Sequence, residues 1–202
     1  MKYGDRVEKK STKAHYKIVE HTSNGKILLQ RLVIGSKSDN TLIVDDLNSF
    51  KAIRPIEGTI LYFDDDYDFL SNLFEEPILH NGVSYPSAEH AFQALKTNDE
   101  EQKNKILQVN SPSKVKVLGK KLPLKENWEN IKDEEMYNIC LSKFKNNAIL
   151  KEKLLNTGNL KLVNGNTGGD DYWGAVIDKN DIIGTNKLGT ILMKVREELK
   201  NS

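Results

Sequence analysis

Cysteine is nearly absent from this sequence, because Cys140 is the only one among 202 residues. A single thiol excludes an internal disulfide bond and a zinc site built from cysteines. Its place in the helical run EEMYNICLSKF is typical of a small buried side chain. His15, His21 and His80 lack the spacing of metal ligands, and no glycine-rich loop of the P-loop or dinucleotide-binding type occurs. We therefore expect neither a metal nor a cofactor.

Arginine is also scarce, and neither sign of charge is in clear excess. Thirty lysines and arginines stand against 29 aspartates and glutamates, and only four of the basic residues are arginines, so bidentate phosphate clamps are few. The net charge of +1 creates no overall field that would attract nucleic acid or anionic lipid. One modest basic run, KKSTKAHYK, leaves a local contact with nucleic acid open.

Long apolar runs are lacking as well. No stretch approaches the roughly 18 apolar residues that span a bilayer. The start of the chain, MKYGDRVEKK, is charged and has no apolar signal core. The sequence thus predicts a cytoplasmic protein without a membrane segment.

The first 57 residues differ in pattern from the rest. HYKIVEHTSNGKILLQRLVIG places two β-rich runs around Asn24-Gly25, which is a strong hairpin signal, and NTLIVDDLNSFKAI adds further strand. We predict a small antiparallel β unit over residues 1–57, loosely similar to an SH3 barrel, whose binding partner the sequence does not identify. The run RPIEG combines proline and glycine at the boundary.

From residue 58 to residue 202, short strands mix with helical segments. GTILYF is typical of a strand, and ILHNGVSY predicts a second hairpin around Asn81-Gly82. Helices are predicted in SAEHAFQAL, in DEEQKNKILQV with Asn98 or Asp99 as its cap, in KDEEMYNICLSKF, in AILKEKLLNTG and in LGTILMKVREELK. The fold class is therefore α+β, with a mostly helical second domain.

The segment YPSAEHAFQALK, with Pro86 in the first helical turn, carries the strongest candidate site. On a helix, Glu89, Gln93 and Lys96 lie within about 60° of one another and span about 10 Å along the axis. One interpretation is a solvated ladder that stabilises the helix by a few tenths of a kcal/mol. The other is a polar line that faces a cleft. The periodicity of the helix by itself favours the ladder.

Motifs outside this helix change that balance. FLSN precedes the helix, and GKKLPLKENW, MYNICLSKFKNN, LLNTGNLKLVNGNT, DDYWGAV and GTNKLG follow it in order, from about residue 58 to residue 200. This set resembles the NADAR (YbiA-like) family. Its members are N-glycosidases that release a guanine or guanine-derived amine from a phosphorylated ribose. The substrate class that the resemblance implies is either ADP-ribosylated guanine in nucleic acid or the ribosylamino-pyrimidine intermediates of riboflavin synthesis.

The resemblance also implies site residues. The family's catalytic glutamate and lysine fall on Glu89 and Lys96, and Asp170 is a candidate second carboxylate. Many members carry a glutamate where this chain has Asn164, so that position offers no second carboxylate here. The expected substrate-binding residues are Asn72, Gln93, Trp128, Trp173, Gly174 and Asn186.

Two catalytic schemes stay open at this level. In one, Glu89 works with a second carboxylate on the oxocarbenium-like charge and the leaving nitrogen. In the other, unprotonated Lys96 attacks C1′ and forms a Schiff base. The dipole at the start of the helix favours an ionised Glu89, which suits a base or a cation stabiliser.

Several assignments have simpler alternatives. Trp128 could equally belong to the core, and Asn186 could cap the last helix rather than help to hold a phosphate at its start. His90 is most simply a hydrogen-bonding residue behind the site. For the whole protein, the alternative is a non-catalytic ADP-ribose or nucleotide-binding module, which would have no use for Glu89 with Lys96. The appended β unit slightly favours a macromolecular substrate.

Overall fold

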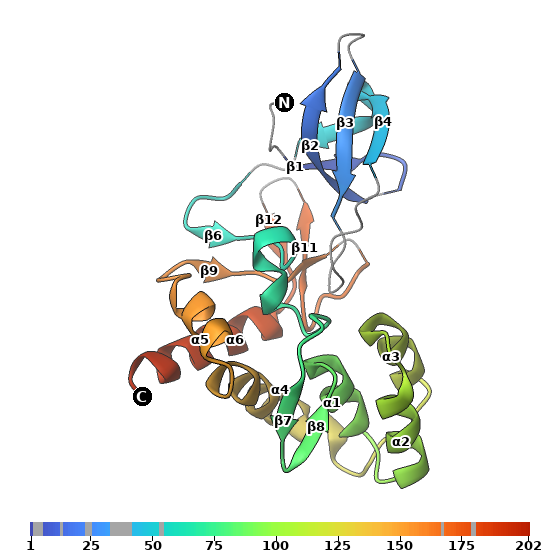
Figure 1. The fold of residues 1–202 in the computed structure, drawn as a ribbon, viewed down its shortest axis with the longest axis vertical. Helices are drawn as coiled ribbons and strands as arrows, with labels where there is room; N and C mark the ends of the chain where they lie inside the picture. The colour runs from blue at the N-terminus through green and yellow to red at the C-terminus, as the bar shows by residue number, and fades with distance from the viewer. Residues whose placement is uncertain are drawn as a thin grey trace.

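The computed structural model describes residues 1, 6–12, 14–22, 26–32, 42–52, 55–166, 168–178 and 181–202. The fold has the predicted α+β class: an antiparallel sheet comes first, and a mainly helical part with short strands follows (Figure 1). No helix within these ranges combines the length and the apolar character needed to cross a membrane.

The N-terminal part is a five-stranded antiparallel sheet in the order β4-β3-β2-β1-β5. Strands β2 and β3 pair as predicted, whereas Asn24 and Gly25 between them lie outside the described residues. Alternate side chains form a core that belongs to this sheet, made of Val7, Tyr16, Ile18, Ile27, Leu29 and Phe50. The strands are β1 (Arg6–Lys9), β2 (His15–His21), β3 (Lys26–Arg31), β4 (Leu42–Asp46) and β5 (Phe50–Ala52).

Contacts along one end of the sheet join it to the helical part. Arg6 of β1 pairs with Asp64, and the rings of His15 and Tyr62 meet edge to face with their centroids 4.6 Å apart. Arg6 and His15 precede the boundary that we predict after residue 57, and Tyr62 and Asp64 follow it. That the first 57 residues form an independent unit remains a prediction.

Short strands support the helical part in three places. Strand β6 (Thr59–Ile60) runs parallel to β9 (Lys161–Leu162), and β11 (Ala175–Asp178) lies between β10 (Gly165–Asn166) and β12 (Asp181–Ile183). Strands β7 (Ile78–His80) and β8 (Val83–Tyr85) form the predicted second hairpin. Its turn residues Asn81 and Gly82 both have positive φ angles, as a type I′ turn requires.

The helices of this part are α1 (Ala88–Ala94), α2 (Glu100–Gln108), α3 (Pro112–Gly119), α4 (Trp128–Lys145), α5 (Ala148–Leu155) and α6 (Lys187–Lys200), and a 3₁₀ helix, η2, spans Asp65–Leu70. Helix α1 contacts α2, α3 and α4, and all its residues are buried. One apolar face of α6 lies in the same core, as does Cys140. Figure 1 shows α2 and α3 side by side next to α1, across from α6.

Two features of the helices differ from the prediction. Helix α1 starts later than expected, because Ser87 is its N-cap and accepts a hydrogen bond from the His90 N–H, so Pro86 precedes the helix. Helix α3 was not predicted at all, although a serine followed by Pro112 is a helix-start signal. The predicted cap of α2 is confirmed, with Asp99 in that position.

Candidate active site

The polar line of α1 faces a cavity of about 500 Å³. Glu89 and Gln93 are only 6% and 3% exposed, and α3 and α4 pack on either side of the helix. The interpretation as a solvated ladder is therefore wrong for these two residues. Of the predicted site residues, the cavity is lined by Asn72, Glu89, Gln93, Lys96, Asp170 and Trp173.

The FLSN loop is fixed both to the start of α1 and to α4. The carbonyl of Asn72 accepts a hydrogen bond of 3.0 Å from the Glu89 N–H, and the side-chain amide of Asn72 lies 3.1 Å from the sulfur of Met136. Lys143 of α4 is buried and donates to the carbonyl of Ser71 at 2.8 Å. Burial lowers the pKa of Lys143 to about 8. These contacts explain how FLSN and YPSAEH form one wall of the cavity.

Glu89 is held in an environment that favours its protonated form. Burial raises the pKa of Glu89, and this effect outweighs the hydrogen bond from Gln93 and the nearby charges of Lys116 and Lys96, which lower it. The Gln93 side-chain N–H donates to Oε1 of Glu89 at 2.7 Å. The helix dipole favours an ionised Glu89, whereas burial raises its pKa and so acts in the opposite direction. A raised pKa is the shift that a proton-donating carboxyl group requires.

Lys96 follows α1, which ends at Ala94, and its side chain extends along the cavity wall. Its Nζ lies 5.4 Å from the centre of the Phe92 ring. Burial lowers the pKa of Lys96 more than the carboxylate of Glu89 raises it. The cavity lining thus holds a carboxyl group whose pKa is raised and a lysine whose pKa is lowered, both by burial.

The absence of a side chain at Gly119 makes room for the side chain of Gln93. A Cβ atom at Gly119 would lie 1.7 Å from Oε1 of Gln93 and 2.4 Å from its Cδ, so no side chain fits there while Gln93 keeps its position. In the described part of the chain, Oε1 of Gln93 has no hydrogen-bond partner. The close approach of α3 to α1 therefore holds the Gln93 amide against Glu89.

Gly119→Ala is expected to lower the free energy of unfolding by about 1–3 kcal/mol, because overpacking exceeds the gain of about 1 kcal/mol in helix propensity. The displaced Gln93 loses its hydrogen bond to Glu89, so activity falls as well. Denaturant unfolding of Gly119→Ala, Gln93→Ala and the double variant checks this. In the double variant the added methyl should cost almost nothing, since Gln93 no longer occupies the space. Additive losses would contradict the packing that we describe.

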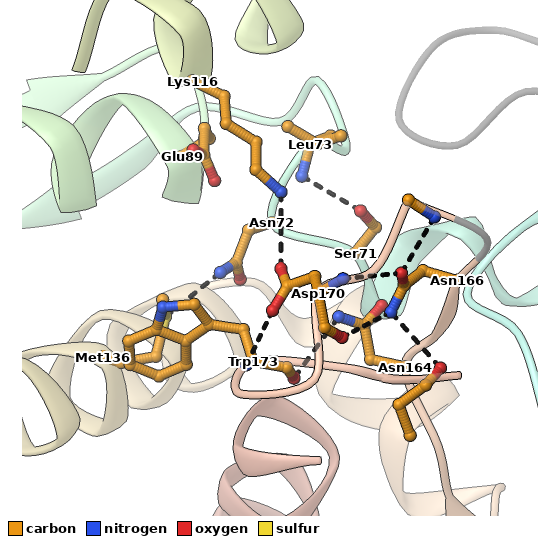
Figure 2. Close-up of polar contacts among 12 residues, drawn as sticks. Ser71, Asn72, Leu73, Glu89, Lys116, Met136, Asn164, Asn166, Asp170 and Trp173 are labelled. Atoms are coloured by element: carbon orange, nitrogen blue, oxygen red, sulfur yellow. Dashed lines mark hydrogen bonds and ion pairs between the residues drawn. The ribbon is translucent and has the colours of Figure 1, made fainter. Parts of the chain in front are cut away.

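The loop between β10 and β11 forms the wall opposite α1 and α3 (Figure 2). Asp170 accepts a hydrogen bond of 2.9 Å from the Trp173 N–H through Oδ1, and its Oδ2 lies 3.7 Å from Nζ of Lys116. The side chain of Asn166 bonds both the N–H and the carbonyl of Asp170. The Trp173 ring meets Phe92 edge to face at 5.2 Å. The loop thus sets an aromatic surface and a carboxylate at the cavity.

Three predicted substrate-binding residues lie behind the wall instead of in the lining. Trp128 is buried, and its ring centroid lies 5.2 Å from that of Phe92. This agrees with the alternative that places Trp128 in the core. Asn186 is the N-cap residue of α6, but its side chain makes no capping bond and instead accepts from the Asn164 N–H and donates to the Leu162 carbonyl, both at 2.9 Å. Gly174 lets the chain pass close to its neighbours, since a Cβ there would lie 2.5 Å from a carbonyl oxygen.

His90 has the supporting role that its simpler interpretation gives it. Its Nε2 donates to the carbonyl of Val109 at 2.7 Å, and its Nδ1 accepts from the hydroxyl of Ser87 at 2.7 Å. The ring therefore ties the start of α1 to the end of α2. Within the described residues, no three His, Cys, Asp or Glu side chains are grouped so that they could hold a metal ion.

Two lysines of the cavity are missing from the sequence-based site. Lys116 lies in α3, and Lys120 is the C-cap residue of the same helix. Both line the cavity. Their spacing of four residues was the only local signal that they share a face. In a chain with so many lysines, such a spacing does not single out a site.

Comparisons with known proteins match the helical part. The NADAR domain profile covers residues 61–200. N-glycosidase YbiA of Escherichia coli K12 is 38% identical over 149 residues, which is 71% of this chain and 91% of that protein. An N-glycosidase of Nostoc punctiforme is 32% identical, covering 67% of this chain and 87% of that protein.

Two further similarities concern a larger protein and a solved structure. A riboflavin biosynthesis protein of Vibrio vulnificus is 34% identical over 145 residues, which is 69% of this chain and 38% of that protein. The NMR structure of E. coli YbiA superimposes with a TM-score of 0.63 at 37% identity, over 73% of this chain and 88% of that one.

Proposed function

This chain belongs to the NADAR family and is an N-glycosidase, and we propose that it cleaves the bond between C1′ of a phosphorylated ribose and a guanine or guanine-derived amine. The observation that carries the proposal is the pairing of Glu89 and Lys96 in one cavity. Burial raises the pKa of Glu89 and lowers that of Lys96, which favours the proton donor and the unprotonated amine that this reaction needs.

In the reaction that we propose, neutral Lys96 adds to C1′ of the ring-opened ribosylamine. Glu89 donates its proton to the departing nitrogen, the bond from C1′ to that nitrogen breaks, and C1′ remains joined to Nζ of Lys96 as a Schiff base. Water then hydrolyses the Schiff base, which releases the sugar and returns the lysine. Trp173 and Phe92 provide an aromatic surface for the leaving base.

Asp170 faces the same cavity, so a scheme with two carboxylates has its second candidate in place. However, its Oδ1 accepts a hydrogen bond from the Trp173 N–H, which fixes the loop, and its Oδ2 lies 3.7 Å from the ammonium group of Lys116. We therefore assign Asp170 to positioning the loop and balancing the charge of Lys116, with proton transfer left to Glu89.

Two substrates share the proposed chemistry. The riboflavin biosynthesis protein among the relatives supports a ribosylamino-pyrimidine phosphate. The N-terminal sheet supports ADP-ribosylated guanine in nucleic acid, with the basic run KKSTKAHYK as the segment that would contact it. Both compounds occur inside cells, which is consistent with a cytoplasmic protein.

Product analysis tests the function. The full chain is incubated separately with DNA that carries ADP-ribosylated guanine and with the ribosylamino-pyrimidine phosphates, and products are identified by mass spectrometry. Release of ADP-ribose from the first, or of ribose 5-phosphate from the second, supports the function and selects the substrate. E. coli YbiA is assayed in parallel on the same substrates as the comparison enzyme. If this chain releases neither product, the proposed function is contradicted.

A further inference from the structure

The charged side chains of the cavity lie at different depths. In the described part of the chain, the lining contains the lysines 96, 116 and 120 and the carboxylates of Glu89 and Asp170. The lining therefore has more lysines than carboxylates. An anionic group of the substrate would balance this excess.

The three lysines are suited to different tasks. Lys96 is partly buried against the Phe92 ring, where an amine loses its proton more easily. Lys116 is 48% exposed, and Lys120 is exposed as well, so both side chains reach solvent at the mouth of the cavity. Their spacing of four residues puts them on one face of α3, about 6 Å apart along the axis. A single phosphate group can contact both.

Neither of these two ammonium groups is firmly engaged. Nζ of Lys116 lies 3.7 Å from Oδ2 of Asp170, beyond the range of about 2.7–3.2 Å for a good hydrogen bond. Exposed ion pairs of this kind contribute little to stability, so the exchange of one partner for another is cheap. Lys120 has no ion-pair or hydrogen-bond partner for its Nζ among the residues that the structure describes.

We propose that Lys116 and Lys120 form the phosphate subsite of the cavity and hold the phosphate of the substrate's ribose at the edge of α3. Asp170 is the counter-ion that keeps Lys116 extended across the mouth until the phosphate replaces it (Figure 2). This inference rests on the proposed function and orients the substrate within it, with the phosphate at α3 and C1′ between Glu89 and Lys96. The leaving base then lies towards Trp173.

Binding measurements test the subsite without any turnover. Titration calorimetry compares ribose 5-phosphate, ADP-ribose and ribose on the full chain, on Lys116→Gln/Lys120→Gln and on Lys121→Gln. Lys121 follows directly in sequence, is exposed and is not part of the lining, so it is the matched control. The double variant is expected to bind ribose 5-phosphate at least about tenfold more weakly, since two charge-assisted contacts are lost. Lys121→Gln should bind like the wild type.

The two phosphorylated ligands identify which phosphate the subsite takes. Weaker binding of ribose 5-phosphate alone indicates a monoester, and weaker binding of both ligands indicates that a pyrophosphate also fits. Wild-type affinity of the double variant for both ligands overturns the subsite. An equal loss for unphosphorylated ribose also overturns it, because the lysines would then not act on the phosphate.

Asp170→Asn separates the counter-ion role from a proton-transfer role. The amide still accepts from the Trp173 N–H but neither binds Lys116 as an ion nor repels a phosphate. We expect ribose 5-phosphate to bind about threefold or more tightly, as removal of a like charge at short range predicts. Unchanged affinity together with a large fall in kcat contradicts the counter-ion role.

The proposed function and the subsite fail in different ways. Absence of turnover on both substrates, together with lysine-dependent binding of ribose 5-phosphate, overturns the function and leaves the subsite standing. Turnover in which the double variant keeps the wild-type KM for the phosphorylated substrate overturns the subsite and leaves the function standing.

Discussion

Glu89→Gln is expected to lower kcat by about 10³-fold or more, within the range for loss of a general acid, while KM changes little. The amide has the same shape and still accepts the hydrogen bond from Gln93, so the cavity stays intact. Single-turnover and steady-state rates on the substrate identified by product analysis measure the effect. Near-normal turnover of Glu89→Gln would remove Glu89 from the mechanism.

The stability of the same variant provides an independent check. The raised pKa of Glu89 means that the folded protein binds a proton that the unfolded chain has already released. The free energy of unfolding of the wild type should therefore fall as the pH rises from the usual value of 4.5 to the raised pKa. Glu89→Gln should lack this fall. Identical pH profiles of stability for the two proteins would show that Glu89 is not buried as described.

Lys96→Ala is expected to reduce kcat by at least about 10³-fold, because removal of a covalent nucleophile leaves only binding and polar stabilisation. If the Schiff base forms, borohydride added during turnover reduces it and leaves the sugar on Lys96, so the wild type is inactivated and gains the mass of the reduced sugar on that peptide. Lys125→Arg serves as a control, since this neighbouring lysine lies outside the cavity lining. An unlabelled wild type, together with an active Lys96→Ala, would favour catalysis by Glu89 without the lysine.

The pH dependence of kcat follows from the same two groups. The fraction of neutral Lys96 rises about tenfold for each pH unit as the pH approaches its lowered pKa from below. The fraction of protonated Glu89 falls about tenfold for each pH unit above its raised pKa, so the rate rises with pH below both pKa values and falls above both. The profile should be bell-shaped, and Glu89→Gln should retain only the rising limb.

Local sequence signals predicted the elements that local interactions fix. The turn at Asn81-Gly82 forms because both residues tolerate positive φ, and Asp99 caps α2 because its carboxylate reaches free N–H groups. The helical spacing of Glu89 and Gln93 likewise follows from geometry within one turn, whereas Lys96 comes after the end of α1 at Ala94. The order of the motifs predicted the family, and the comparisons confirmed it.

Long-range packing decided what those signals could not. Periodicity favoured a solvated line on α1, but α3 and α4 pack against the helix, and the resulting burial raises the pKa of Glu89. Lys116 joins the cavity only because Gly119 lets α3 approach Gln93.

The sequence by itself determined the fold class and the family, and it predicted Glu89 in α1 and Lys96 just after α1 as the reactive residues. Only the tertiary structure decided that Asn186 and Trp128 lie behind the wall while Lys116 and Lys120 stand at the mouth. The reason is physical: residue type and spacing specify what a side chain can do, whereas its surroundings, drawn from distant parts of the chain, set its hydration, its charge and what it can reach.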